Sequence, residues 1–371
     1  MPADRTFDIA VVAGDGIGPD VIAAAQSVLA AARDAVGGFE LRYVEGAAGA
    51  GTYRDTGEDI SEADFEAARR ADAILLGAIG LPDVRHSDGT EISPHLRMRD
   101  AFQLFAGVRP VKAFPNTPRK LADRRAGDID LIILRESTEG LFYSHGRGEV
   151  SEIEARDTLR ITRATSEKLF DFGFRLAEKR KARGHQGEMI CVDKANVFRS
   201  MAFFRKIFDE RAAQFPNVAT GYNYVDAQAL DLIRRPWDFD VLVMENMFGD
   251  ILSDLGGGLV GGMGMAPCAE IGTNHGLFQP AHGSAPDIMN QGVANPTAAI
   301  LSAAMMLDWL GERHDVPEAI QAGALIDRAV WRGFQRERIR PAEFGGDGTT
   351  ASMTDGVIRS LMELAQKNAA P

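Results

Sequence analysis

The chain has 371 residues, of which 45% are hydrophobic and 25% charged, and it carries a net charge of −12. Such a composition is that of a globular protein whose core needs no disulfide or metal staple, and it argues against disorder. The sequence contains no apolar run of about 18 residues, the length that would predict a membrane span. The short polar N-terminus resembles no signal peptide, so we expect a cytoplasmic protein. The acidic balance excludes nucleic acid and anionic membranes as general partners, and an anionic substrate would need a locally basic pocket.

Short apolar runs alternate with longer stretches that have helical periodicity. The runs predicted to be strands are 7–13, 71–77, 129–134, 188–192 and 239–244, and the predicted helices are 19–35, 166–181 and 295–311. Apolar runs this short are typical of strands buried on both faces. The alternation therefore predicts an α/β fold with a largely parallel sheet and helices on both faces. The polar segment 142–163 breaks the pattern and is predicted to be a projecting hairpin or arm. Cys191 and Cys268 lie in apolar runs and are expected to be packing residues.

The first candidate motif is GDGIGP at 14–19, between a predicted strand and a helix. Backbone N–H groups of such a loop can bind an anion. The motif is neither GxGxxG nor a P-loop, so a tight turn without a ligand is the favoured interpretation.

Asp250 and Asp254 form the most specific pair, because a spacing of four places both carboxylates on one helix face. Two like charges there repel unless a cation joins them, and Mg²⁺ or Mn²⁺ suits such oxygen ligands. Asp226 in YVDAQ is a third candidate ligand. The alternative is a solvated acidic face.

Four basic residues follow strands or lie on a facing helix. Lys194, directly after a predicted strand, can act as a general base, although an ordinary surface lysine is the alternative. Arg99, Arg109 and Arg135 can clamp carboxylates in bidentate fashion, although surface ion pairs are the alternative. In the loop HGSAPD, Asp287 can accept hydrogen bonds from the ribose hydroxyls of an adenosine and would repel a 2′-phosphate, or it can simply belong to a turn.

Taken together, the strings GDGIGP, RESTEGL, VDKANV, YVDA, FGDILSD, HGSAPDI and ANPTAAILSAAMML resemble the β-decarboxylating dehydrogenases over roughly residues 7 to 360. That family includes isopropylmalate, isocitrate, homoisocitrate, tartrate and D-malate dehydrogenases, and the general pattern is most like the 3-isopropylmalate enzymes. The resemblance implies a two-domain fold of the isocitrate/isopropylmalate dehydrogenase type. Residues 1–104 and 261–371 would form the cofactor-binding domain. Residues 105–260 would form the substrate, metal and dimerisation domain, with its arm at about 142–163.

The resemblance also implies roles for individual residues in a homodimer with shared active sites. The neighbouring subunit would supply Lys194 and Asp226, and the metal, Mg²⁺ or Mn²⁺, would be bound by Asp226, Asp250 and Asp254. The carboxylates of a malate-type substrate would be held by Arg99, Arg109 and Arg135. The NAD adenosine pocket would consist of His282, Gly283, Ser284, Ala285, Asp287 and Asn295. The implied reaction is an oxidative decarboxylation coupled to the reduction of NAD, with Lys194 and Asp226 as catalytic residues. Tyr143 is the working candidate for the proton donor.

Two positions depart from the family pattern. Phe142 stands where the family has the tyrosine that donates a proton, and Tyr143 follows it. If this segment is a strand, the two side chains point to opposite faces, and Tyr143 replaces the missing tyrosine only with a bulge. The other possibilities are that His145 or a water donates the proton, or that the chain catalyses the full reaction poorly.

The second departure lies before Arg99, where the family contacts the substituent on C3 of the substrate. Leu96 keeps the apolar character of the isopropylmalate enzymes, whereas His95 and Arg97 could contact a polar or carboxylate group, unless Arg97 points outward. The expected substrate is 3-isopropylmalate, with isocitrate, homoisocitrate, tartrate or D-malate as alternatives. A non-catalytic regulatory subunit of the same fold is the hypothesis from another class.

Overall fold

The computed structural model describes residues 5–369 and contains one ten-stranded sheet with the strand order β2-β1-β3-β12-β11-β4-β5-β10-β8-β9. The strands are β1 (Arg5–Gly14), β2 (Phe39–Gly46), β3 (Ala73–Ala78), β4 (Ala106–Lys112), β5 (Asp130–Glu136), β8 (Glu188–Asp193), β9 (Ala219–Tyr224), β10 (Val241–Met244), β11 (Pro267–Ile271) and β12 (Gly276–Pro280). Most neighbours pair in parallel, but β4 is antiparallel to β5 and β11, and β11 is antiparallel to β12. The predicted α/β fold with a largely parallel sheet is confirmed.

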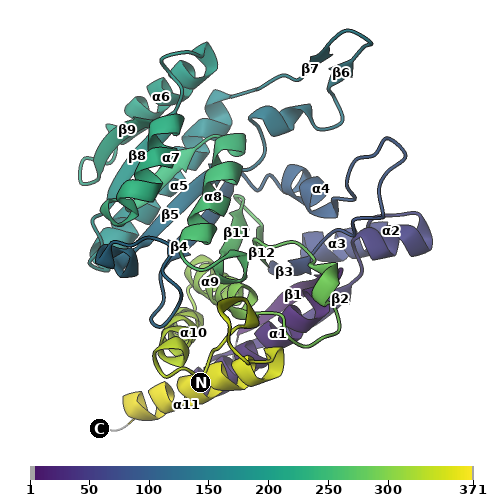
Figure 1. Cartoon of the computed structure of the whole chain (residues 1–371), viewed down its shortest axis with the longest axis vertical. Helices are drawn as coiled ribbons and strands as arrows, with labels where there is room; N and C mark the ends of the chain where they lie inside the picture. Colours follow the sequence, from purple (N-terminus) through teal and green to yellow (C-terminus); the bar gives the residue numbers. More distant parts are fainter. Residues whose placement is uncertain (1–4, 370–371) are drawn as a thin grey trace.

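Helices cover both faces of this sheet (Figure 1). They are α1 (Gly18–Val36), α2 (Ala50–Thr56), α3 (Glu62–Arg70), α4 (Pro94–Ala101), α5 (Arg163–Ala182), α6 (Arg199–Ala212), α7 (Val225–Arg234), α8 (Asn246–Leu259), α9 (Thr297–His314), α10 (Pro317–Gln335) and α11 (Thr350–Ala369). Alternate strand residues face opposite layers. In β1, Ile9 and Val11 pack into the core beneath α1 and α9, whereas Ala10 and Val12 pack beside α3.

The strand alternation decides which polar groups share one face. Val108 of β4, Leu134 of β5 and Ala269 of β11 belong to the core on the α5 and α9 side. Their neighbours Arg109, Arg135 and Glu270 therefore project from the opposite face, on the side of the sheet where α8 packs on β4 and β5. Because β4, β5 and β11 are adjacent in the sheet, these three side chains converge.

The predicted arm is a hairpin that projects from the molecule, with the short strands β6 (Glu149–Val150) and β7 (Ala155–Arg156) (Figure 1). The arm prediction extended to residue 163, but α5 already begins there, because the Thr162 side chain caps the helix by accepting a hydrogen bond from Thr165 N. Among residues 5–369, none of the helices has the length and apolar character that crossing a bilayer requires.

Candidate active site

Two buried arginines pair with one buried carboxylate at the middle of the sheet, and a third lies beside them. Arg109 of β4 donates through Nη2 to Glu270 Oε1 at 3.0 Å, and Nη2 of Arg99, from α4, forms an ion pair with the same oxygen at 2.8 Å. Arg135 lies close enough that Arg99 and Arg109, after burial, are the main causes that lower its pKa to about 10. The prediction that these arginines lie together is therefore matched by their placement, in contrast to the alternative of scattered surface ion pairs.

Glu270 is the residue that sequence reasoning missed. Its side chain has no exposed surface, and burial alone would raise its pKa. The nearby charges of Arg99, Arg109 and Arg135 outweigh burial and lower the pKa to about 2. Only its position in an otherwise apolar strand, PCAEI, could have signalled it, because a buried carboxylate requires a cation nearby.

The carboxylate pair lies next to this cluster. Helix α8 begins after Glu245, whose side chain accepts from Phe248 N at 2.9 Å. Asp250 and Asp254 both lie on it, and Arg135 Nη1 donates to Asp250 Oδ1. Burial and the charge of Asp250 raise the pKa of Asp254. An excess of negative charge thus adjoins the arginines, as expected of a cation site.

Lys194 and Asp226 lie together on another part of the same half of the sheet. Lys194 follows β8, Asp226 begins α7, and the lysine Nζ donates to the aspartate Oδ1, which lowers the pKa of Asp226. Within one chain, Asp226 does not join Asp250 and Asp254, and residues 5–369 contain no group of three or more His, Cys, Asp or Glu able to hold a metal ion. A shared ion would require a second copy of the chain.

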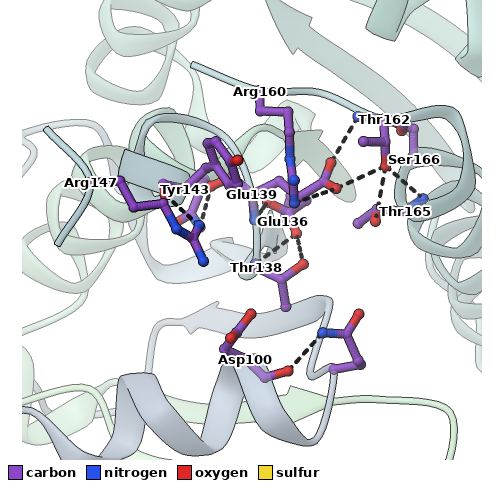
Figure 2. Close-up of polar contacts among 12 residues, drawn as sticks. Asp100, Glu136, Thr138, Glu139, Tyr143, Arg147, Arg160, Thr162, Thr165 and Ser166 are labelled. Atoms are coloured by element: carbon purple, nitrogen blue, oxygen red, sulfur yellow. Dashed lines mark hydrogen bonds and ion pairs between the residues drawn. The ribbon is translucent and has the colours of Figure 1, made fainter. Parts of the chain in front are cut away.

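The Phe142–Tyr143 segment is not a strand, which corrects the expectation that the two rings point to opposite faces. Residues Leu141–Ser144 form a 3₁₀ turn, in which successive side chains lie about 120° apart. Both rings line one cavity of about 300 Å³. Tyr143 lies between Arg147 and Arg160, whose guanidinium carbons are 4.5 and 3.8 Å from its ring centre (Figure 2).

The turn that carries Tyr143 is held by buried carboxylates. Glu136 at the end of β5 accepts from Thr138 N and Glu139 N, both at 2.7 Å, and Glu139 accepts from Thr162 N at 2.8 Å (Figure 2). Gly140 has φ 67°, and a Cβ there would lie 2.8 Å from Asn246 Cβ, so only glycine fits. The segment RESTEGL is therefore a rigid connection between β5 and the arm.

The cavity also receives Leu96, Arg97 and Arg99 from α4, together with Ser93, His145 and Arg147. Arg97 points toward Glu62, with which it forms an ion pair at 3.0 Å. His95 does not line the cavity. Burial, followed by the charge of Arg99, lowers its pKa to about 3, and its Nδ1 has no hydrogen-bond partner. Its predicted contact with the C3 substituent stays a prediction.

The loop predicted to bind adenosine packs on the glycine-rich turn. Ile17 N donates to Ser284 O at 2.8 Å, Gly18 N to Asp15 O and Asp15 N to Ala78 O, so the turn has few N–H groups left for an anion. This agrees with a structural turn at 14–19. The Asp15 carboxylate accepts from the backbone N–H groups of three residues, Ala50, Gly51 and Gly80.

Within the predicted adenosine pocket, polar atoms remain unused. His282 Nε2 is buried without a partner, and burial lowers the pKa of this histidine. Gly283 and Asp287 are exposed, and Ala285 adopts a left-handed conformation at φ 39°. Asn295 donates through Nδ2 to Glu343 at 2.7 Å, a contact from the C-terminal part of the chain that sequence reasoning missed.

Comparisons with known proteins agree with this architecture. The model of the isocitrate/isopropylmalate dehydrogenase family matches residues 8–357. The 3-isopropylmalate/3-methylmalate dehydrogenase of Methanocaldococcus jannaschii is 38% identical, over 96% of this chain and 99% of that one. The 3-isopropylmalate dehydrogenase of Aquifex aeolicus is also 38% identical, over 97% and 98% of the two chains.

Solved structures show the same fold. An isocitrate dehydrogenase from Methylococcus capsulatus has a TM-score of 0.82 at 33% identity, covering 96% of this chain and 99% of its own. A β-decarboxylating dehydrogenase from Thermococcus kodakarensis has a TM-score of 0.79 at 36% identity, covering 98% and 99%. With sequence, fold and the arrangement of arginines and carboxylates in agreement, the chain belongs to the isocitrate/isopropylmalate dehydrogenase family and is a β-decarboxylating dehydrogenase.

Proposed function

We propose that the chain catalyses the oxidative decarboxylation of a malate-type 2-hydroxy acid, with NAD as hydride acceptor and Mg²⁺ or Mn²⁺ as the metal. One observation carries this proposal: an anion-binding cluster of buried arginines touches the carboxylate pair of α8 through Arg135 and Asp250. A hydroxy acid that chelates a cation needs both kinds of site side by side. The first candidate substrate is 3-isopropylmalate, supported by the relatives at 38% identity.

The proposed role of each residue follows from the charge of its side chain. Arg99, Arg109 and Arg135 bind the substrate carboxylates and fix their orientation. When held by Asp250 and Asp254, the metal would supply a Lewis acid for the C2 oxygen, and NAD would supply the hydride acceptor. Lys194 of the partner subunit takes the hydroxyl proton, and Asp226 holds its Nζ. After CO₂ leaves, Tyr143 delivers a proton to C3, balancing the reaction.

The residues present fit both groups. Asp250 and Asp254 supply hard oxygen ligands, and a cation would offset the charge repulsion that, after burial, raises the pKa of Asp254. The buried and unpartnered Nε2 of His282 fits a polar ligand atom in the 282–287 loop. The exposed Asp287 carboxylate can accept from two ribose hydroxyls and would repel a 2′-phosphate, which favours NAD over NADP.

A homodimer with shared active sites is part of the same proposal, as is the expected cytoplasmic location. Exposed apolar side chains gather on the turn after β8 and on α6, β9, α7 and α8: Val197, Phe198, Phe203, Tyr222, Tyr224, Leu230, Ile233 and Ile251. In the arm, Val150 and Ile153 are 84% and 92% exposed. Apolar surface of this extent marks an interface, and a second copy would bring its own Lys194 and Asp226.

An assay of NADH production with Mn²⁺ and a panel of malates tests the proposal. The panel contains 3-isopropylmalate, isocitrate, homoisocitrate, tartrate and D-malate, and we expect turnover of 3-isopropylmalate. Turnover of another member would change the substrate but keep the reaction. No turnover of any member, with NAD and Mn²⁺ still bound, would instead favour a non-catalytic subunit.

A further inference from the structure

Glu270 lies at the centre of the arginine cluster without a role in the reaction described above. In the β11–β4 pairing it lies opposite Gly107. A Cβ at Gly107 would be 2.6 Å from Ser137 Oγ and 3.0 Å from Glu270 Oε2. The missing side chain of Gly107 therefore provides the space in which the carboxylate reaches both Arg99 and Arg109.

The contacts of Glu270 leave some polar atoms of the cluster unpaired. Each of Arg99 and Arg109 uses Nη2 on Glu270 Oε1, while the Nε atoms of both arginines are buried without a partner. A buried guanidinium donor without an acceptor is costly. Glu270 Oε2 is likewise buried without a partner, so the hydrogen bonds of the cluster are incomplete in the isolated chain.

The charges around the cluster can be counted. Three arginines carry three positive charges, of which the Glu270 carboxylate, ion-paired with Arg99 and Arg109, cancels one. Asp250 and Asp254 match the charge of one divalent cation, and Lys194 and Asp226 cancel each other as an ion pair. Counting only these side chains and the metal, two positive charges remain, the number that a dicarboxylate dianion neutralises.

We propose that Glu270 is a specificity-determining residue that adapts the site to malate-type dianions with an uncharged C3 substituent and disfavours trianions such as isocitrate. This inference rests on the proposed function and narrows its substrate class. Buried in a region of low dielectric, one extra negative charge acts strongly on a nearby anion. Like-charge placement against an unwanted ligand is an effective source of selectivity.

The remainder of the cavity offers no net positive charge for a third carboxylate. Of its two other arginines, Arg97 is neutralised by Glu62, whereas Arg147 contacts only the ring and carbonyl oxygen of Tyr143. Of the three acidic residues that line the same cavity, Glu91 is paired with Arg85 at 2.9 Å, and Asp59 and Asp100 form no ion pair within residues 5–369. Asp100 lies on α4, across from the turn with Thr138 (Figure 2). A C3 substituent with a negative charge would meet more anions than free cations.

The variant Glu270→Gln tests this role because it removes the charge and nearly conserves the shape. The ratio of kcat/KM for isocitrate to that for 3-isopropylmalate should rise at least about tenfold. Calorimetry with two non-reacting probes, tricarballylate and succinate, in the presence of Mg²⁺ should show the same shift toward the trianion. The calorimetric experiment measures the preference between trianion and dianion even if no panel member is turned over. Failure of the proposed reaction and failure of this inference are therefore distinguishable.

Asp240→Asn is the matched control. Asp240 is also a buried carboxylate paired with an arginine, Arg180, but it precedes β10, at the end of that strand away from α8. This variant should keep the wild-type preference. An unchanged ratio in folded Glu270→Gln protein would overturn the inference. Should that variant fail to fold, the wild type still decides, because a wild-type preference for tricarballylate over succinate is incompatible with the proposal.

Discussion

At the scale of single residues, the proposed proton donor is the phenol of Tyr143, which follows a phenylalanine at position 142. The 3₁₀ turn directs both rings into one cavity, and Phe142 is in addition held 4.9 Å from the guanidinium carbon of Arg135. Position 142 therefore keeps a packing role, while position 143 keeps the hydroxyl.

The variant Tyr143→Phe should lower kcat for CO₂ release about 100-fold, the usual loss for a proton donor, with little change in KM. Adding Phe142→Tyr to it should recover part of the rate, because both positions face the same cavity. Tyr43→Phe, with the tyrosine on the edge strand β2, is the control. Stopped-flow NADH formation and CO₂ release check these outcomes, and wild-type kcat in Tyr143→Phe would identify another donor, such as His145.

At the scale of elements, the end of β8 shows how a flexible lysine is positioned. Asp193 is fully buried and accepts from Arg205 Nε and Nη2, both at 2.7 Å, and from Ala195 N at 2.8 Å. The backbone on both sides of Lys194 is thus fixed, because its neighbours Asp193 and Ala195 are joined by a hydrogen bond. Arg205 in turn stacks on Tyr222 and Tyr224 of β9.

The variant Arg205→Gln leaves the Asp193 carboxylate buried without its cation, which should cost about 3 kcal/mol of unfolding free energy. It should also lower kcat more than it raises KM, because Lys194 loses its fixed orientation. Arg199→Gln on the same helix changes an exposed arginine and should stay within about 0.5 kcal/mol of wild type. Urea denaturation and steady-state kinetics measure both, and equal stability of the two variants would contradict this account.

At the scale of the whole molecule, the proposed shared site predicts complementation between inactive subunits. Lys194→Met and Arg99→Gln should each abolish turnover. When the two variants are mixed in equal amounts and refolded, about half of the dimers should be heterodimers, and each heterodimer contains one intact site of two. About a quarter of the wild-type sites should therefore be restored. Activity in the mixture and sedimentation of the dimer are the measurements. Heterodimers that form without activity would show that each chain builds its site alone.

The sequence alone determined the strands and helices of this protein and the spacing of residues within them. Buried strands can be recognised in the sequence because a strand buried on both faces must be apolar at successive positions. The runs at 129–134 and 188–192 correspond to β5 and β8. The i,i+4 spacing of Asp250 and Asp254 needed only a helix to bring the two together. The boundaries predicted for the two domains stay a prediction, because the sheet runs through both without a break.

Only the tertiary structure decided which distant groups meet. Glu270 contacts Arg99 and Arg109 because β11 inserts antiparallel to β4, a pairing that no local pattern encodes. Likewise, the sequence predicted only an arm from residue 142, whereas residues 141–144 form a 3₁₀ turn next to hydrogen bonds that join Glu136, Glu139 and Thr162. Local periodicity reports which face of an element is apolar, whereas the charge and shape of a site depend on contacts between residues far apart in the chain.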